Sequence, residues 1–164
     1  MKSCKYEAGF TLVEMLIVVA IIALLATMVV GLAGRIDNQS KERALKSTFA
    51  LLDSALQEYY EYTGEFPVAD NADPNLNSEI LYAALDSVPP SRTILEKVNS
   101  SLIQNNFNPT AVPPIPEIYD PWWPNNKNKR RVLDYRYALG DTFPKLISSG
   151  PDGIFDTADD ISSR

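Results

Sequence analysis

The chain contains no histidine, and its single cysteine is Cys4, close to the start. Without histidine there is no histidine-based catalytic triad and no imidazole ligand for a metal. One cysteine alone cannot form a disulfide within the chain or a thiolate zinc site. Enzymes that use only carboxylates, lysine, serine or tyrosine are not excluded, but no recognisable arrangement of that kind is present. We therefore expect a protein that is not an enzyme.

Positive charge is also scarce, because the formal net charge is −6 over 164 residues. The one basic cluster consists of Lys127, Lys129, Arg130 and Arg131 and follows Asn125 and Asn126. A short cluster in that setting predicts a solvated loop. Since proteins that bind nucleic acid normally carry a basic patch, we expect no nucleic-acid partner.

An apolar run extends from Phe10 to Gly34 and contains one acid, Glu14. At about 1.5 Å per residue, a helix of this length crosses a hydrocarbon core of roughly 30 Å. A secretory signal peptide is the alternative, with Gly31-Leu32-Ala33 as its cleavage site, but its apolar core is usually about 7–15 residues. Lysine and arginine lie on both sides of the run, so the charge rule does not fix its orientation.

The start of this run carries a fixed motif of Gly9, Phe10, Thr11, Leu12 and Glu14 behind a short polar segment. It resembles the class III prepilins, which are the type IV pilins and the pseudopilins of type II secretion. The resemblance implies that residues 1–9 are a leader, cut after Gly9 by a prepilin peptidase that also methylates the new N-terminal Phe10. Residues 10–34 would be the transmembrane and assembly half of a long helix. Residues 35–164 would be an exported globular domain that includes the amphipathic half of that helix.

The same resemblance makes Glu14 an assembly residue. The α-amino group created at Phe10 lies four residues away, on the same helix face. A carboxylate and an amine are both charged at neutral pH, and each is costly to leave unpaired in an apolar bundle. In pilin-like filaments the glutamate is thought to meet the amine of a neighbouring subunit. The spacing also allows a pair within one chain, and a glutamate that reaches the membrane edge is a third interpretation.

Beyond Gly34 the helical pattern continues in amphipathic form, with apolar side chains at Leu45, Phe49, Leu52, Leu56 and Tyr59. This spacing predicts one helix from about Phe10 to Tyr62. Gly64 and Pro67 follow as helix-ending residues. Two separate helices with a break near Gly34-Arg35 are the alternative.

The middle of the chain predicts little regular structure. Two short helices are expected, from Ser78 to about Leu85 and from Ser91 to Gln104. The proline-rich stretch 105–124 predicts an irregular connector. Trp122 and Trp123, near its end, are expected to cover a sheet.

That sheet is predicted after the connector. Residues 132–138 and 143–148 alternate as strands, and Gly140-Asp141 between them predicts a hairpin. Leu133, Tyr135 and Tyr137 share one strand face, which we expect to pack against the long helix.

A cluster of acids closes the chain, consisting of Asp152, Asp156, Asp159 and Asp160 with Gly150 and Gly153 nearby. Crowded carboxylates repel one another unless a cation neutralises them, and hard oxygen ligands suit Ca²⁺. The spacing is not that of an EF-hand. The segment resembles the C-terminal calcium loop of the major pseudopilin, in which Asp152 and Asp160 match best, and carbonyls of residues 147–150 would complete the shell. A solvated acidic tail is the alternative.

Taken together, the resemblance implies an α+β, pilin-like lollipop with a long N-terminal helix packed on a small antiparallel β-sheet and a C-terminal calcium loop. Its function would be that of a structural subunit of a type II secretion pseudopilus, which helps move folded proteins across the outer membrane. The protein would sit in the inner membrane as a single-pass protein, with its C-terminal domain in the periplasm, and would be extracted into a periplasmic helical filament.

Its partners would be other copies of itself, prepilin peptidase, the inner-membrane assembly platform and minor pseudopilins. A type IV or competence pilin is one rival interpretation, but those pilins commonly carry a disulfide that the mature chain cannot form. A membrane-anchored binding domain that does not polymerise is a second. A hydrolase that uses Asp156, Asp159 and Asp160 is a third, supported only by their clustering.

Overall fold

The computed structural model describes residues 10–69, 72–107, 109–110, 112–122 and 131–164, without the side chains of residues 28–35. The predicted leader, with Gly9, and Trp123 lie outside the described residues. The chain divides into two compact units, which meet between Gln39 and Ser40. The predicted α+β class is confirmed, because one long N-terminal helix is followed by shorter helices and two small antiparallel sheets.

Helix α1 spans Leu12–Thr63 without a break, so the prediction of one long helix is confirmed over that of two. It ends where the sequence predicts. Gly64 adopts a φ of 84°, and its N–H donates to the carbonyl of Tyr60 at 2.8 Å. Glycine reaches this left-handed conformation without the steric penalty of a Cβ atom, which is why it terminates helices.

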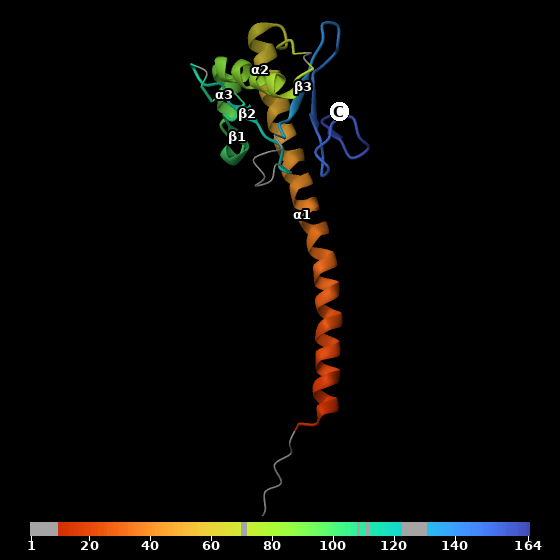
Figure 1. The fold of residues 1–164 in the computed structure, drawn as a ribbon. Coiled ribbons are helices and arrows are strands. Elements are labelled where there is room, and N and C mark those ends of the chain that lie inside the picture. The colour runs from red at the N-terminus through yellow and green to blue at the C-terminus, as the bar shows by residue number, and fades with distance from the viewer. Residues whose placement is uncertain (1–9, 70–71, 108, 111, 123–130) are drawn as a thin grey trace, which may run out of the picture. The chain divides into compact units, whose positions relative to one another are not determined.

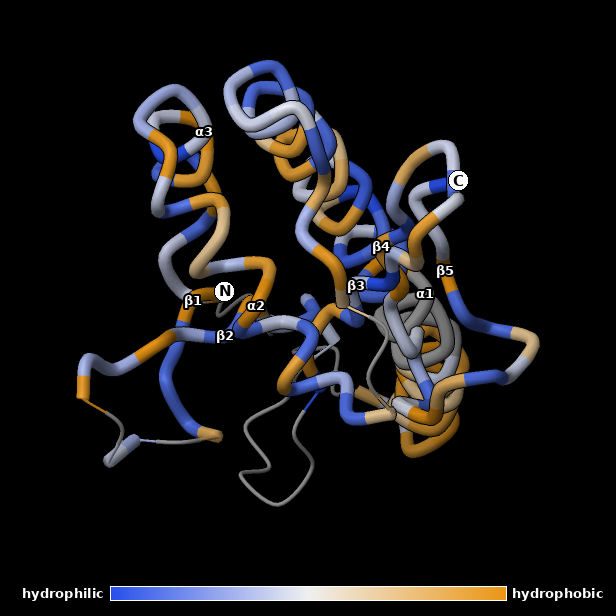
Figure 2. Tube along the Cα trace, turned by 90° about the horizontal axis from the view of Figure 1, so that it is seen from above, coloured by the Kyte–Doolittle hydropathy of each residue, from blue (hydrophilic) through white to orange (hydrophobic). Residues whose placement is uncertain are grey.

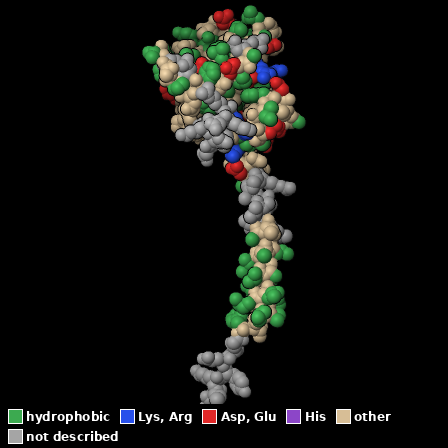
Figure 3. Space-filling model, in the orientation of Figure 1, with side chains coloured by type: hydrophobic (Ala, Val, Ile, Leu, Met, Phe, Trp, Pro, Cys, Tyr) green, Lys and Arg blue, Asp and Glu red, His purple; other side chains and the backbone are tan. Residues whose placement is uncertain are grey.

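In the first unit, residues 15–26 of α1 carry only apolar side chains, so this part of the helix is apolar on every side. Figure 3 shows apolar side chains along the visible face of this part of the helix. Between residues 12 and 25, the large exposed apolar side chains are Leu12, Val13, Met15, Leu16, Ile17, Val18, Val19, Ile21, Ile22, Leu24 and Leu25. A helix that is apolar all round is normally covered by lipid or by other protein.

Among the residues whose positions and side chains are described, no helix has both the length and the apolar character needed to cross a membrane. The predicted crossing at residues 10–34 includes side chains that lie outside this description, so it stays a prediction.

In the second unit, the later turns of α1 form one wall of the core. Leu45, Phe49, Leu52 and Leu56 are buried, as the amphipathic spacing predicts, and Tyr59 packs against the same cluster. Trp122 joins this cluster too, which confirms that it covers the core. Burying each such side chain contributes about 1.5–3 kcal/mol to the stability of the folded state.

The predicted hairpin is confirmed and gains a third strand. Strands β3 (Asp134–Arg136), β4 (Lys145–Ser148) and β5 (Ile161–Ser162) form an antiparallel sheet in that order. Asp134 lies opposite Ile147, and Ser148 lies opposite Ile161. Only two residues form β5, which is too short for an alternating pattern to reveal it.

Strand β3 is covered on both faces, although the sequence predicted packing for only one. Tyr135 and Leu133 point into the core with α1, as expected. On the opposite face, the Asp134 carboxylate is 1% exposed and accepts a hydrogen bond from Asn77 Nδ2 at 2.8 Å. It also pairs with Arg136 Nε at 2.6 Å. Helix α2 therefore packs on the polar face of the strand through a hydrogen bond.

The short helices differ from their predicted bounds. Helix α2 spans Pro74–Ser87 and is capped by Asp73, whose Oδ1 accepts from Asn75 N–H at 3.0 Å. The sequence predicted a start at Ser78, but Ser78 is buried inside the helix, where its hydroxyl accepts from Ile118 N–H at 2.9 Å. Helix α3 spans Pro89–Leu95 and stops well before Gln104. A 3₁₀ turn η1 (Ser100–Leu102) and strand β1 (Ile103–Gln104) replace its predicted end.

The proline-rich stretch also contains a strand that the sequence did not predict. Strand β2 (Glu117–Ile118) pairs antiparallel with β1. Glu117 is fully buried, and its carboxylate accepts from the backbone N–H groups of Asn106 and Phe107 at 3.0 and 2.5 Å. Side-chain oxygens thus satisfy backbone donors that no regular ladder reaches.

Figures 1 and 2 show how these pieces surround β3. Helices α2 and α3 with β1 and β2 lie on one side of it, and the chain that carries β4, β5 and the C-terminal loop lies on the other. The extended segment that contains β3 is hydrogen-bonded to both groups. Leu133 N–H donates to Ile118 O, and Asp134 pairs with Ile147 of β4.

Glu117→Ala should destabilise the domain by about 2–5 kcal/mol, because two backbone N–H groups lose their acceptors. Glu117→Gln keeps one acceptor oxygen and should fall between alanine and wild type. Chemical unfolding of the detergent-solubilised protein measures the order, with the exposed Glu96→Ala as control. Equal stability of the alanine variant and wild type would contradict the role of Glu117 as the acceptor for these two N–H groups.

Candidate functional site

The N-terminal motif forms a helix cap. Helix α1 begins directly after Thr11, and Glu14 lies in its first turn. Glu14 Oε2 accepts from the backbone N–H and the hydroxyl of Thr11 at 2.9 and 2.8 Å. Glu14 N–H in turn donates to Thr11 Oγ1 at 3.2 Å. This reciprocal arrangement is a capping box, which satisfies two donors at the start of a helix.

Sequence reasoning missed this cap, although its signal is present. A threonine followed three residues later by a glutamate, just ahead of an apolar run, is the pattern of a capping box. The negative charge of Glu14 also lies where the helix dipole favours it. Phe10, 81% exposed, immediately precedes the cap. The predicted pair between Glu14 and an amine at Phe10 stays a prediction.

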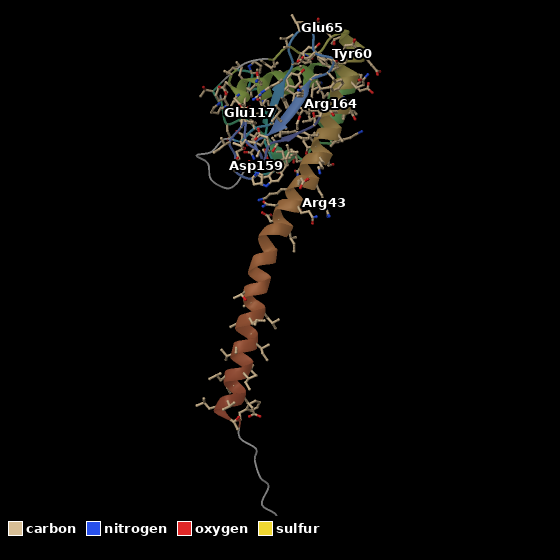
Figure 4. The ribbon with its side chains drawn as sticks, turned by 90° about the vertical axis from the view of Figure 1, so that its right-hand side faces the viewer. Arg43, Tyr60, Glu65, Glu117, Asp159 and Arg164 are labelled. Atoms are coloured by element: carbon tan, nitrogen blue, oxygen red, sulfur yellow. The ribbon has the colours of Figure 1, made fainter. Side chains whose placement is uncertain are left out.

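The four aspartates of the C-terminal loop lie between β4 and β5 and are joined in two pairs by loop N–H groups. Asp159 Oδ2 accepts from Asp152 N–H at 3.0 Å, and Asp160 Oδ2 accepts from Asp156 N–H at 2.7 Å. Figure 4 marks Asp159 on this loop. Thr157 Oγ1 donates to Asp159 Oδ1 at 2.7 Å.

These bonds favour charged carboxylates. The pKa of Asp159 lies below its usual value because it accepts from the Thr157 hydroxyl and then from Asp152 N–H. Asp156 also lies 3.7 Å from the Arg136 guanidinium, which links the outer part of the loop to β3.

The loop offers only oxygen atoms as ligands, which is the donor chemistry that Ca²⁺ takes. Within the described part of the chain, however, no group of three or more histidine, cysteine, aspartate or glutamate side chains is arranged to hold a metal ion. The oxygen donors of the loop suit calcium by their chemistry, but the described structure does not bring three of the carboxylates together at one metal position, and the calcium site remains a prediction.

Arg131 corrects the prediction that the basic cluster is a solvated loop. Its side chain is buried, and its guanidinium reaches into the acidic loop. Nη1 donates to the carbonyls of Pro151 and Gly150 at 3.1 and 3.4 Å, and Nη2 donates to Asp152 O at 2.9 Å. The carbonyl of Gly150, expected among the metal ligands, thus accepts from an arginine. The other basic residues of the cluster lie outside the described residues.

Beneath the loop lies a second buried charge, Asp120. Its carboxylate accepts from the Ser148 hydroxyl and, at 2.8 Å, from Trp122 N–H. Burial raises the pKa of Asp120, while these bonds and the positive charge of Arg131 oppose the rise. Ser148 Oγ in turn accepts from Gly150 N–H at 3.1 Å. Sequence reasoning gave Asp120 no role in the loop.

The two cavities found among the described residues give the hydrolase interpretation no support. One described cavity of about 250 Å³ lies between α2 and α3, and another of about 280 Å³ lies between α1 and β5. Neither is lined by Asp156, Asp159 or Asp160.

Comparison with known proteins identifies the N-terminal motif. Residues 4–30 match the family model described as the prokaryotic N-terminal methylation motif. The chain is 28% identical to the Type II secretion system core protein G of Escherichia coli (strain K12) over 165 residues. That alignment covers 99% of this chain and 94% of the relative. No solved structure matches the chain. The methylation motif, the similarity over nearly the full length, and a long N-terminal helix followed by small antiparallel sheets together support a pseudopilin.

Proposed function

We propose that the protein is a structural subunit of a type II secretion pseudopilus. The observation that carries this proposal is the N-terminal helix, which begins in a prepilin motif and is apolar on every described side. Such a helix needs lipid or other apolar helices around it. The similarity to a type II secretion core protein supports the choice of machine. The protein works by assembly and not by catalysis.

In this proposal, prepilin peptidase removes residues 1–9 and methylates Phe10. The chain then sits in the inner membrane as a single-pass protein with residues 35–164 in the periplasm. The assembly platform and minor pseudopilins start a helical filament in which apolar helices replace lipid around each subunit. Exchanging one apolar environment for another involves little hydrophobic cost, so extraction from the membrane is feasible.

Two rival functions share parts of this structure. A type IV or competence pilin has the same N-terminus, but the single cysteine and the acidic loop favour a pseudopilin. A membrane-anchored binding domain would need the helix only as an anchor. The assembly experiment on Glu14 below separates that rival from a filament subunit.

Processing can be followed through Cys4, because the single cysteine lies in the predicted leader. Protein made with prepilin peptidase should lose all reactivity toward a thiol-specific maleimide and carry an N-methylated Phe10 in mass spectrometry. Gly9→Val should keep both the leader and the thiol, because the peptidase needs close access to the backbone at glycine. A mature wild-type protein that still reacts with maleimide would contradict cleavage after Gly9.

Two substitutions of Glu14 separate its capping role from its charge. Glu14→Ala removes both, and loss of capping alone costs a helix about 0.5–2 kcal/mol. Glu14→Gln keeps an acceptor for Thr11 N–H but carries no charge. We expect both variants to insert into the membrane and neither to form filaments, because an assembly pair with an amine requires the carboxylate.

Filament yield after overproduction, measured by shearing and sedimentation, tests this expectation. Glu42→Gln, a glutamate in the later part of α1 that pairs with Lys46, serves as the control and should assemble normally. Wild-type yield from Glu14→Gln would show that Glu14 acts only as a cap.

We also infer that the C-terminal loop binds Ca²⁺ through the carboxylates of Asp152, Asp156, Asp159 and Asp160. The support is their donor chemistry, their pairing through loop N–H groups and the lowered pKa of Asp159. Bound calcium would neutralise the crowded charge and stabilise the folded state by mass action.

Calcium at 100 times its Kd should stabilise the protein by about 2.7 kcal/mol, which raises Tm by roughly 5–10 °C over the value in excess chelator. Asp160→Asn should abolish most of this difference while keeping an acceptor for Asp156 N–H. Asp141→Asn is the matched control, because Asp141 accepts Ala138 N–H outside the loop. Identical melting curves of the wild type with calcium and with chelator would refute the site.

A further inference from the structure

We propose that Arg131 is a built-in cation that closes the C-terminal loop from the inside, so that the loop is formed before any metal binds. Arg131 is then a positioning residue for the outer carboxylates of the loop. Loop closure by Arg131 does not depend on calcium. The effect of Arg131 on calcium affinity rests on the proposed function.

The first observation is where the guanidinium points. Its two terminal nitrogens donate to the carbonyls of three consecutive residues, Gly150, Pro151 and Asp152. Nη1 also reaches Trp122 O at 3.5 Å. The planar fork of arginine can serve several acceptors at fixed angles, which a lysine ammonium cannot match. Backbone oxygens of the loop are thereby turned inward, toward a cation that the chain itself supplies.

The second observation is how closely the loop wraps this cation. A Cβ atom placed on Gly153 would lie 2.0 Å from Arg131 Nε and 2.2 Å from Cζ. On the other side of the loop, a Cβ atom on Gly150 would lie 2.2 Å from the carbonyl oxygen of Asp159. Both glycines have positive φ angles, 71° and 60°. The two glycines of the acidic segment therefore allow the chain to close on Arg131 and on itself.

The third observation is that the buried guanidinium acts electrostatically on a buried carboxylate, although its Nε has no hydrogen-bond partner among the described residues. Arg131 is 9% exposed, and an unpaired charge at such a position would be strongly destabilising. The positive charge acts on the buried Asp120 carboxylate, which accepts from the Ser148 hydroxyl. Ser148 Oγ accepts from Gly150 N–H, so both the N–H and the carbonyl of Gly150 are held by one network.

The consequence for the outer surface follows from this geometry. With the carbonyls of residues 150–152 directed inward, an external cation would have to use the side-chain oxygens of the loop aspartates, several of which also accept loop N–H groups. Their arrangement depends on a backbone that Arg131 already holds. Calcium would then bind a formed loop without having to fold it, and its affinity would depend on a residue that does not touch it.

Hydrogen exchange of residues 150–160 in the full-length, detergent-solubilised protein tests the proposal, in excess chelator and in saturating Ca²⁺. In the wild type, the backbone amides of the loop should be protected from exchange even in excess chelator. Arg131→Met should speed exchange there by about tenfold or more, the change expected from losing charge-assisted hydrogen bonds, and Ca²⁺ should restore part of the protection. Arg131→Lys should fall in between. Strands β3 and β4 should stay protected, which distinguishes a local effect from general unfolding.

Arg92→Met is the control, because Arg92 forms its ion pair with Asp86 away from the loop. If Arg131→Met fails to fold, Gly153→Ala provides the second variant, since its methyl group would displace the guanidinium. It should also speed exchange of the loop in chelator.

Two results would overturn the proposal. One is a wild-type loop that is unprotected in chelator, and the other is protection in Arg131→Met or Gly153→Ala equal to that of wild type. Calorimetry with Ca²⁺ alone separates this proposal from the proposed calcium site. A wild type that binds no calcium but needs Arg131 for loop protection would refute the calcium site and support the closure by Arg131.

Discussion

The domain depends on one packing interaction, between the apolar face of α1 and the inner face of β3. Leu52 and Leu56 on the helix share a core with Tyr135 on the strand and with Leu133, which directly precedes it. Helix α2 and strand β4 are placed around the same strand, since α2 covers the opposite face of β3 and β4 extends the sheet from its edge. Large side chains suffice for this layer because the helix supplies a continuous apolar row over several turns.

Polar interactions do the more specific work at the edges of this core. Asp120, Arg131 and Asp134 are all buried, and each is bonded to a segment far away in the sequence. In a chain with a single cysteine, no disulfide can tie the C-terminal segment down. Buried hydrogen-bonded charges take over that role, and they are sensitive to the loss of either partner. A core of leucines would accept several alternative arrangements, whereas these pairs accept one.

The sequence predicts well those elements whose apolar pattern repeats over many residues or whose end is marked by a strong stop signal. Leu45 to Leu56 repeats over enough turns to identify the helix and its buried face, and Gly64 marks its end. The alternation around Tyr135 likewise identifies the hairpin. Strands β2 and β5 have two residues each, which is too few to show an alternating pattern. The contacts of Ser78, Glu117 and Arg131 depend on partners that only the folded chain brings near. Within the candidate sites, the spacing of Thr11 and Glu14 did carry a readable signal of a helix cap. By contrast, no pattern in the sequence indicates that the carbonyls of residues 150–152 point inward toward Arg131.

The position of the helix cap has a consequence for maturation. Both partners of the cap, Thr11 and Glu14, lie on the helix side of the proposed cut, and all three of their hydrogen bonds are made within this short segment. These three cap bonds are therefore made without any contribution from the leader. Precursor and mature chain can share this cap, and the proposed removal of the leader would change the charge next to it. Maturation of this subunit would then be an electrostatic event on a helix that is already formed.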